Sequence, residues 1–281
     1  MSGKLIIHGG FFSESSTNNE TRIAKQEALK RIAGEAYNYL QTHSAQETVV
    51  YAVALLEDDA LFNAGTGSQI QSDGKVRMSA SLHNGSTLKF SGVINIEDVQ
   101  HPIHVAESLM AYDDRVLGGE GAIQYARSKN VPVYDPIIPQ RREEYLQKKS
   151  ALRTSTVGCV ALDASGNLAA ATSTGGKGFE IPGRISDSAT TAGNFCNAHC
   201  GVSCTGVGED IVSVALATKI VTRVTDGFSI DKAFAKSFDE LASIDGFAGA
   251  IAIDAHGNIF HQDSHPTMVF ASFDGEKMEV F

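Results

Sequence analysis

Hydroxyl side chains and glycines are concentrated between residues 154 and 209, a segment that holds 10 of the 27 glycines of the chain. A serine or threonine hydroxyl is a weak nucleophile unless a base lies beside it. No histidine is close to Thr156 in the sequence, so the base that remains is the α-amine of the nucleophile itself. That amine is free only after a cut immediately before it. Thr156 starts an expected strand directly behind a polar segment, and a cut there would expose such a nucleophile.

Two opposite charges, Arg184 and Asp187, follow Gly183 in the same segment. The planar guanidinium group of arginine matches a carboxylate, so these charged residues are candidates for a functional site. The alternative is a local surface ion pair that stabilises the fold by about 0–1 kcal/mol. In the same way, Thr174 and Thr205 could be ordinary strand residues, and the residue types alone leave both interpretations open.

The first half of the chain, which must position part of this chemistry, combines helices with short strands. Ser44 followed three residues later by Glu47 is typical of a capping box at a helix start. Three prolines and dense charges over residues 130–155 predict a solvated, mobile linker. The expected elements are a strand over 4–8, helices over 20–40 and from Ser44 onward, and helical segments over 101–111 and 120–128.

The second half has a different character, with strands at both ends and helices between them. Two similar segments, 160–168 and 251–259, each place a Gly-Asn turn between apolar runs and predict hairpins. The expected elements are strands over 156–162 and 168–172, and helices over 209–225 and 230–242. This order predicts an α+β protein in which two packed sheets are covered by helices, a four-layer αββα arrangement forming one folded domain overall.

Composition excludes several classes of protein. The 281 residues carry a formal charge of −10, which disfavours nucleic acid and anionic membranes as partners. No window approaches the roughly 20 apolar residues of a membrane-spanning helix, and the first residues lack a signal-peptide pattern. The four cysteines form no Cys-x-x-Cys pair and are expected to be buried, reduced thiols. We therefore expect a cytoplasmic protein.

Six short motifs appear together in the chain: His8-Gly9-Gly10, Phe62-Asn63-Ala64-Gly65-Thr66-Gly67, Thr156-Val157-Gly158, Ser173-Thr174-Gly175-Gly176, Gly183-Arg184 with Asp187, and Thr205-Gly206-x-Gly208-Glu209. With these motifs in this order, the sequence resembles the plant-type asparaginase and isoaspartyl peptidase family of N-terminal-nucleophile hydrolases. The resemblance covers nearly the whole chain. It implies an αββα sandwich, made as a precursor that cleaves itself before a catalytic threonine.

The resemblance also implies a role for each matching residue. Thr156 would be the nucleophile, freed by a cut between Ser155 and Thr156, and Thr174 would orient its hydroxyl. Arg184 would clamp the α-carboxylate of the substrate and Asp187 its α-ammonium group. The remaining roles are an oxyanion hole from Thr205 and Gly206, a pocket wall from Gly208, and assistance near the scissile bond from Asn63.

The function implied is hydrolysis of the side-chain amide of L-asparagine and of β-aspartyl (isoaspartyl) dipeptides, without a catalytic cofactor. Residues 1–155 and 156–281 would become α and β subunit segments, and we expect a dimer of cleaved α–β units. Alternatives are an amidase like N4-(β-N-acetylglucosaminyl)-L-asparaginase and a binding homologue that never matures. The family also implies a structural sodium bound by backbone carbonyls, which maps to Leu56, Glu57, Asp59, Phe62, Ala64 and Thr66.

Overall fold

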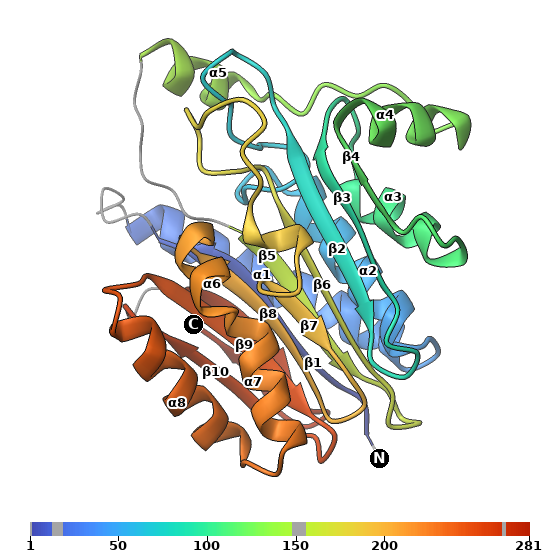
Figure 1. Ribbon diagram of the computed structural model, residues 1–281, viewed down its shortest axis with the longest axis vertical. Coiled ribbons are helices and arrows are strands. Elements are labelled where there is room, and N and C mark those ends of the chain that lie inside the picture. Colours follow the sequence, from blue (N-terminus) through green and yellow to red (C-terminus); the bar gives the residue numbers. More distant parts are fainter. Residues whose placement is uncertain (1, 13–18, 148–155, 266–267) are drawn as a thin grey trace.

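The computed structural model describes residues 2–12, 19–147, 156–265 and 268–281 (Figure 1). Within these ranges the chain forms a mixed α+β fold with one larger and one smaller sheet. Strands and helices from both halves of the sequence are interleaved, so the first half does not fold as a body beside the second. No helix of the described ranges combines the length and the apolar character needed to cross a membrane.

The larger sheet has the strand order β12-β11-β1-β5-β6-β2-β3-β4. Its pairs are antiparallel except for β3 and β4, which run parallel. Strand β5 lies in the middle and is buried along its whole length, which explains its run of small and apolar residues. The strands are β1 (Lys4–Phe11), β2 (Met78–Asn84), β3 (Phe90–Ile96), β4 (Val116–Gly118), β5 (Thr156–Leu162), β6 (Leu168–Thr174), β11 (Met268–Phe273) and β12 (Met278–Val280).

The smaller sheet has the order β10-β9-β8-β7 and packs against the larger one. A buried apolar cluster lies between them, to which β1 contributes Ile6, β5 contributes Val160 and β9 contributes Ile251. Burial of such side chains is the main favourable contribution to this contact. The strands are β7 (Asn194–Cys196), β8 (Cys200–Gly206), β9 (Ala248–Asp254) and β10 (Ile259–Asp263).

Helices cover the two sheets through separate apolar clusters. Residues of α1, α2 and α3 form one cluster with the larger sheet, and residues of α7 and α8 form another with the smaller sheet (Figure 1). The helices are α1 (Asn19–Leu40), α2 (Ala45–Asp58), α3 (Pro102–Ser108), α4 (Gly119–Ser128), α5 (Pro139–Leu146), α6 (Gly208–Val214), α7 (Leu216–Thr225) and α8 (Ile230–Ala242), with 3₁₀ turns η1 (Leu109–Ala111) and η2 (Asp187–Ala189).

Most expected elements are present, and one expectation is corrected. Strand β5 and helix α8 have the predicted bounds, and Ser44 forms the predicted capping box with Glu47 at the start of α2. The single helix expected over 209–225 is instead two helices, because Ala215 adopts a left-handed conformation with φ 51° and ψ 48°. Alanine carries no sequence signal for this conformation, which is ordinarily a glycine conformation.

Helix α5 lies inside the range that was expected to be a linker. The buried side chain of Arg141 donates from Nε to the carbonyl of Gly67 at 2.7 Å. The ring of Tyr145 stacks on that of Phe179, with ring centroids 5.3 Å apart. Helix α5 is therefore attached both to the segment after α2 and to the loop that follows β6.

Replacement of Ser44 by alanine tests the capping box. The Ser44 hydroxyl accepts from the backbone N–H of Glu47, and the Glu47 carboxylate accepts from the backbone N–H of Ser44. Loss of the cap is expected to lower the free energy of unfolding by about 1 kcal/mol. Urea unfolding at equal protein concentration measures the change. Ser44→Thr, which keeps the hydroxyl, is the control, and equal losses in both variants would contradict a capping role.

Candidate active site

One small cavity, with a volume of about 70 Å³, collects most of the residues singled out from the sequence. It lies where the start of β5, the end of β6 and the end of β8 meet the first turn of α6. Asn63 and Thr205 are absent from its lining, as are the residues of the expected sodium loop. The lining residues are Thr156, Thr174, Gly176, Lys177, Arg184, Ser186, Asp187, Gly206, Val207, Gly208 and Glu209.

Three threonines that are far apart in sequence lie close together here; Thr156 and Thr174 line the cavity, and Thr205 is buried next to them. Thr156, the first residue of β5, is directly opposite Thr174 in the β5–β6 ladder. The backbone nitrogen of Thr156 donates to Oγ1 of Thr205, in the other sheet, at 3.2 Å. All three residues are buried. The expected neighbours of the nucleophile are therefore placed around Thr156, whereas the cleavage-site partner Ser155 lies outside the described residues.

Asn63 contacts the loop behind these threonines rather than the cavity. The side-chain amide of Asn63 donates to the backbone carbonyl of Gly176. The backbone carbonyl of Asn63 accepts from the backbone nitrogen of Gly175 at 2.8 Å. The nitrogen of Gly176 in turn donates to Oγ1 of Thr174 at 3.2 Å. Asn63 thus holds the loop that fixes the Thr174 hydroxyl.

Arg184 is paired with Glu209, a partner that the sequence analysis did not assign to the site. Its Nε and Nη2 donate to Oε1 and Oε2 of Glu209 at 2.9 and 2.8 Å. This two-pronged contact lowers the pKa of Glu209 to about 2. The ammonium group of Lys177 lies 3.3 Å from the same Oε1. Glu209 stood within a recognised motif, but nothing in the sequence connected it with an arginine 25 residues earlier.

Asp187 is buried, with 2% of its surface exposed, so the alternative of a surface ion pair is excluded for this residue. Among the described residues its Oδ2 has no hydrogen-bond partner. Burial raises the pKa of Asp187 to about 7, against the lowering effect of the nearby Arg184 charge. A buried carboxylate oxygen without a partner, next to a cavity, is suited to accept a hydrogen bond from a cationic group.

The glycines of the last motif leave room for this arrangement. A Cβ at Gly208 would lie 2.7 Å from Oδ1 of Asp187 and 2.8 Å from Nη2 of Arg184. At Gly206 the backbone has φ +138°, and a Cβ would meet the backbone of Phe247. Any side chain at Gly208 would therefore displace one of the two charged groups.

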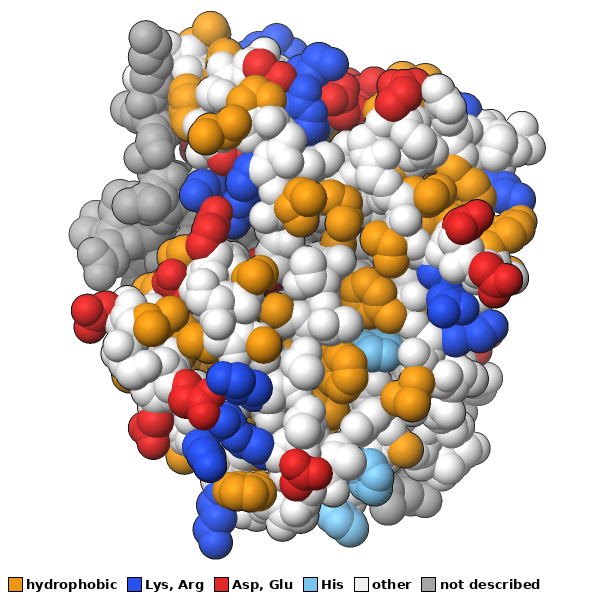
Figure 2. Space-filling model, in the orientation of Figure 1, with side chains coloured by type: hydrophobic (Ala, Val, Ile, Leu, Met, Phe, Trp, Pro, Cys, Tyr) orange, Lys and Arg blue, Asp and Glu red, His pale blue; other side chains and the backbone are white. Residues whose placement is uncertain are grey.

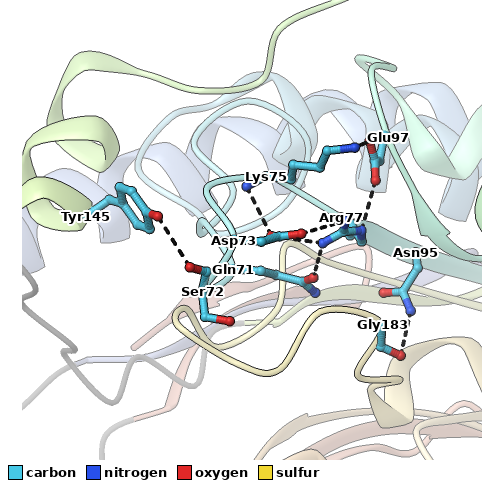
Figure 3. A network of polar contacts seen from close by, with 9 residues as sticks. All are labelled: Gln71, Ser72, Asp73, Lys75, Arg77, Asn95, Glu97, Tyr145 and Gly183. Atoms are coloured by element: carbon cyan, nitrogen blue, oxygen red, sulfur yellow. Dashed lines mark hydrogen bonds and ion pairs between the residues drawn. The ribbon is translucent and has the colours of Figure 1, made fainter.

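The loop that carries Arg184 is also supported from the larger sheet (Figure 3). The side-chain amide of Asn95, at the end of β3, donates to the carbonyl of Gly183 at 3.0 Å. In the same region Arg77 bridges Asp73 and Glu97, with ion-pair distances of 2.8 Å to each. Asn95 and Glu97 were not predicted from the sequence, because the Asn95–Gly183 and Arg77–Glu97 contacts join residues that only the tertiary fold brings together.

Below Thr156, a chain of buried hydrogen bonds connects the two sheets. Nε2 of His8 lies 2.9 Å from Oγ of Ser203, which lies 2.7 Å from Oγ1 of Thr172. Burial lowers the pKa of His8 to about 3, so the imidazole is neutral at physiological pH. His8 is opposite Gly158 in the β1–β5 ladder, and a Cβ at Gly158 would overlap the Ser203 hydroxyl. The close approach of the two sheets beside the site therefore requires this glycine.

The loop expected to bind sodium offers part of the predicted oxygen set. Within the described chain, the backbone carbonyls of Phe62, Ala64 and Thr66 accept no hydrogen bond, whereas those of Glu57 and Asp59 accept from Thr66 and Phe62 at 2.7 and 3.0 Å. Backbone carbonyl oxygens are ligands suited to hard cations. No group of three or more His, Cys, Asp or Glu side chains placed to hold a metal ion occurs in the described ranges.

The fold and the cavity define a class of protein, an α+β protein whose buried threonines lie beside a group of oppositely charged side chains. Comparison with known sequences specifies it further. The sequence model of the asparaginase family matches residues 1–153 and 139–281. A Synechocystis protein named isoaspartyl peptidase/L-asparaginase is 44% identical, covering 98% of this chain and 89% of that protein.

Two further relatives agree with this result. A Nostoc protein with the same name is 43% identical, over 98% of this chain and 93% of its own length. A Pyrococcus abyssi protein named plant-type L-asparaginase is 34% identical, over 91% of each chain. The chain therefore belongs to the asparaginase family, and the resemblance found in its motifs is confirmed.

The raised pKa of Asp187 predicts a pH effect on stability. Because the folded-state pKa of this carboxyl group is raised to about 7, its protonated form favours the folded state. The resulting contribution to the free energy of unfolding is fully present below the unfolded-state pKa and is lost as pH rises through about 7. Asp187→Asn removes the effect, so from pH 5 to pH 8 the variant should gain about 2 kcal/mol relative to wild type. Urea unfolding across this range is the measurement. Asp226→Asn, at an exposed position, is the control, and a pH-independent difference for Asp187→Asn would contradict the assignment.

Proposed function

We propose that the chain is a self-cleaving amidohydrolase that hydrolyses the side-chain amide of L-asparagine and β-aspartyl dipeptides, with Thr156 as nucleophile. The observation that carries the proposal is the presence of Thr156, Arg184 and Asp187 around one small cavity. The names of the relatives, isoaspartyl peptidase/L-asparaginase and plant-type L-asparaginase, support the same substrates. Consistent with a small-molecule substrate, Figure 2 shows acidic and basic side chains interspersed on the visible face, without one continuous basic surface.

The charged pair would hold the aspartyl end of the substrate. The guanidinium of Arg184, kept in place by Glu209, has N–H groups left to donate to the α-carboxylate. The α-ammonium would donate to Oδ2 of Asp187, and its positive charge would favour the ionised form of that carboxylate. With both α-groups held, the β-amide is directed to Thr156. A peptide with an ordinary α-linkage lacks the free α-carboxylate and would lose the Arg184 contact.

The reaction would follow from the groups around Thr156. After cleavage its free amine takes the proton of its own hydroxyl, and the oxygen attacks the β-carbonyl carbon. Thr205 and Gly206 would stabilise the negative charge on the carbonyl oxygen, and Thr174 would orient the attacking hydroxyl. The C–N bond then breaks, the leaving amine takes the proton, and water hydrolyses the resulting ester to release aspartate and restore Thr156.

The proposal extends to the architecture and to a structural ion. The two packed sheets, each covered by helices, would correspond to the four-layer αββα sandwich of N-terminal-nucleophile hydrolases. A sodium ion bound by the carbonyls of Phe62, Ala64 and Thr66 would stabilise the loop that includes Asn63. A cytoplasmic location is supported by the four cysteines, which are buried and free of disulfides.

Self-cleavage is tested by the intact mass of the purified protein. Wild type is expected to give two polypeptides, residues 1–155 and 156–281, because the Thr156 hydroxyl attacks the preceding carbonyl and water opens the ester. Thr156→Ala should remain one chain and hydrolyse neither substrate. Thr222→Ala, at an exposed threonine on α7 outside the cavity lining, should cleave like wild type. Wild-type protein that is active while uncut would contradict the proposed nucleophile.

The clamp is tested with two substrates that share the aspartyl end. Arg184→Ala removes the partner of the α-carboxylate and leaves Glu209 with only the exposed Lys177 as a cation, so kcat/KM should fall by about two to three orders of magnitude. The fall should be similar for L-asparagine and a β-aspartyl dipeptide, because the lost contact is common to both. Arg142→Ala, at an exposed position on α5, is the control. Efficient hydrolysis by Arg184→Ala would mean that another group binds the carboxylate.

A further inference from the structure

Lys177 lines the same cavity as Thr156 but has no role in the function proposed above. It is the third residue after Thr174, so its backbone lies within about 10 Å of that residue. The backbone around it is fixed: the carbonyl of Gly176 accepts from Asn63, and the nitrogen of Lys177 donates to Oε1 of the buried Glu180 at 3.2 Å. A partly exposed ammonium group is thus attached to a well-anchored loop at the cavity.

The two cations near Glu209 differ in exposure. Arg184 has 14% of its side chain exposed and makes two hydrogen bonds to the carboxylate, whereas Lys177 has 39% exposed and makes one contact at 3.3 Å. An exposed, single-contact lysine pair is weak and easily exchanged. One carboxylate therefore serves two cations, the inner one held firmly and the outer one free to bind another anion.

Resting on the proposed function, we propose that Lys177 recognises the free carboxylate of the leaving amino acid in β-aspartyl dipeptides and is a specificity-determining residue. The aspartyl end fills the small cavity between Arg184 and Asp187, with the scissile amide at Thr156. A cavity of about 70 Å³ does not enclose a second amino acid, so the leaving residue extends out of it, toward the side chain of Lys177, which lines the cavity and is 39% exposed. Asparagine releases only ammonia and makes no such contact.

A different role for the same lysine would be to assist Arg184 with the α-carboxylate of the aspartyl unit, since both cations contact Oε1 of Glu209. The exposure of Lys177 favours the leaving-group role, because the inner position is already occupied by Arg184. The two roles predict different substrate dependence, so kinetics with matched substrates separates them.

The experiment measures kcat/KM for a β-aspartyl dipeptide, for the same dipeptide with its C-terminal carboxylate amidated, and for L-asparagine. In wild type the free dipeptide is preferred over its amide. In Lys177→Met the ratio of free dipeptide to amide should fall about twofold to fivefold, mainly through KM, as expected for loss of one exposed charge contact. Lys177→Arg, which keeps the charge, should retain most of the ratio. Intact mass of each variant confirms equal self-cleavage, and rates are expressed per cleaved chain.

Two outcomes would overturn the inference. An unchanged ratio in Lys177→Met would show that the leaving carboxylate is not recognised by this residue. Equal losses on all three substrates would assign Lys177 to the aspartyl clamp instead. Failure of the proposed function is distinct from both, because wild-type enzyme would then hydrolyse none of the three substrates.

Discussion

The close approach of the two sheets at Gly158 is the constraint on which the site depends. A side chain at this position would overlap the Ser203 hydroxyl, so only glycine allows β8 to lie against β5 at this distance. The approach brings Thr205 within 3.2 Å of the Thr156 nitrogen and encloses the hydrogen-bonded chain from His8 through Ser203 to Thr172. Apolar side chains hold the sheets together elsewhere. Beside the site, the absence of a Cβ at Gly158 allows the short distance between them.

The charged side of the cavity is organised by unequal burial of its four ionisable groups. Glu209 is half exposed and neutralises Arg184 through two hydrogen bonds, which leaves part of the guanidinium available. Asp187 is buried with an oxygen lacking a partner among the described residues, and its pKa rises accordingly. The site therefore holds a fixed cation next to a carboxyl group whose ionisation a ligand ammonium would favour, an arrangement that matches a zwitterion.

The same interleaving that builds the site explains how a cut chain could remain one body. Strand β1, from the first half, is hydrogen-bonded on one side to β5 and on the other to β11, both from the second half. Strand β2 likewise pairs with β6, and α5 contacts Phe179 beyond β6 through Tyr145. A break before Thr156 would thus leave the pieces joined by two strand pairings of β1, one of β2 and a shared apolar core.

Local patterns in the sequence were sufficient for several elements, among them the bounds of β5 and α8 and the Ser44 capping box. The motifs behind the family resemblance also named Thr156, Thr174, Arg184 and Asp187, four residues that the fold brings to one cavity. Such patterns reflect backbone geometry over a few residues, which the sequence encodes directly.

The tertiary structure alone decided the partners of those residues. The pairing of Arg184 with Glu209, the burial that leaves Asp187 without a partner, the support of Gly183 by Asn95 and the left-handed turn at Ala215 depend on contacts between distant elements. Burial and charge pairing are properties of the packed fold rather than of neighbouring residues, so the same arginine could have had a different partner in another packing.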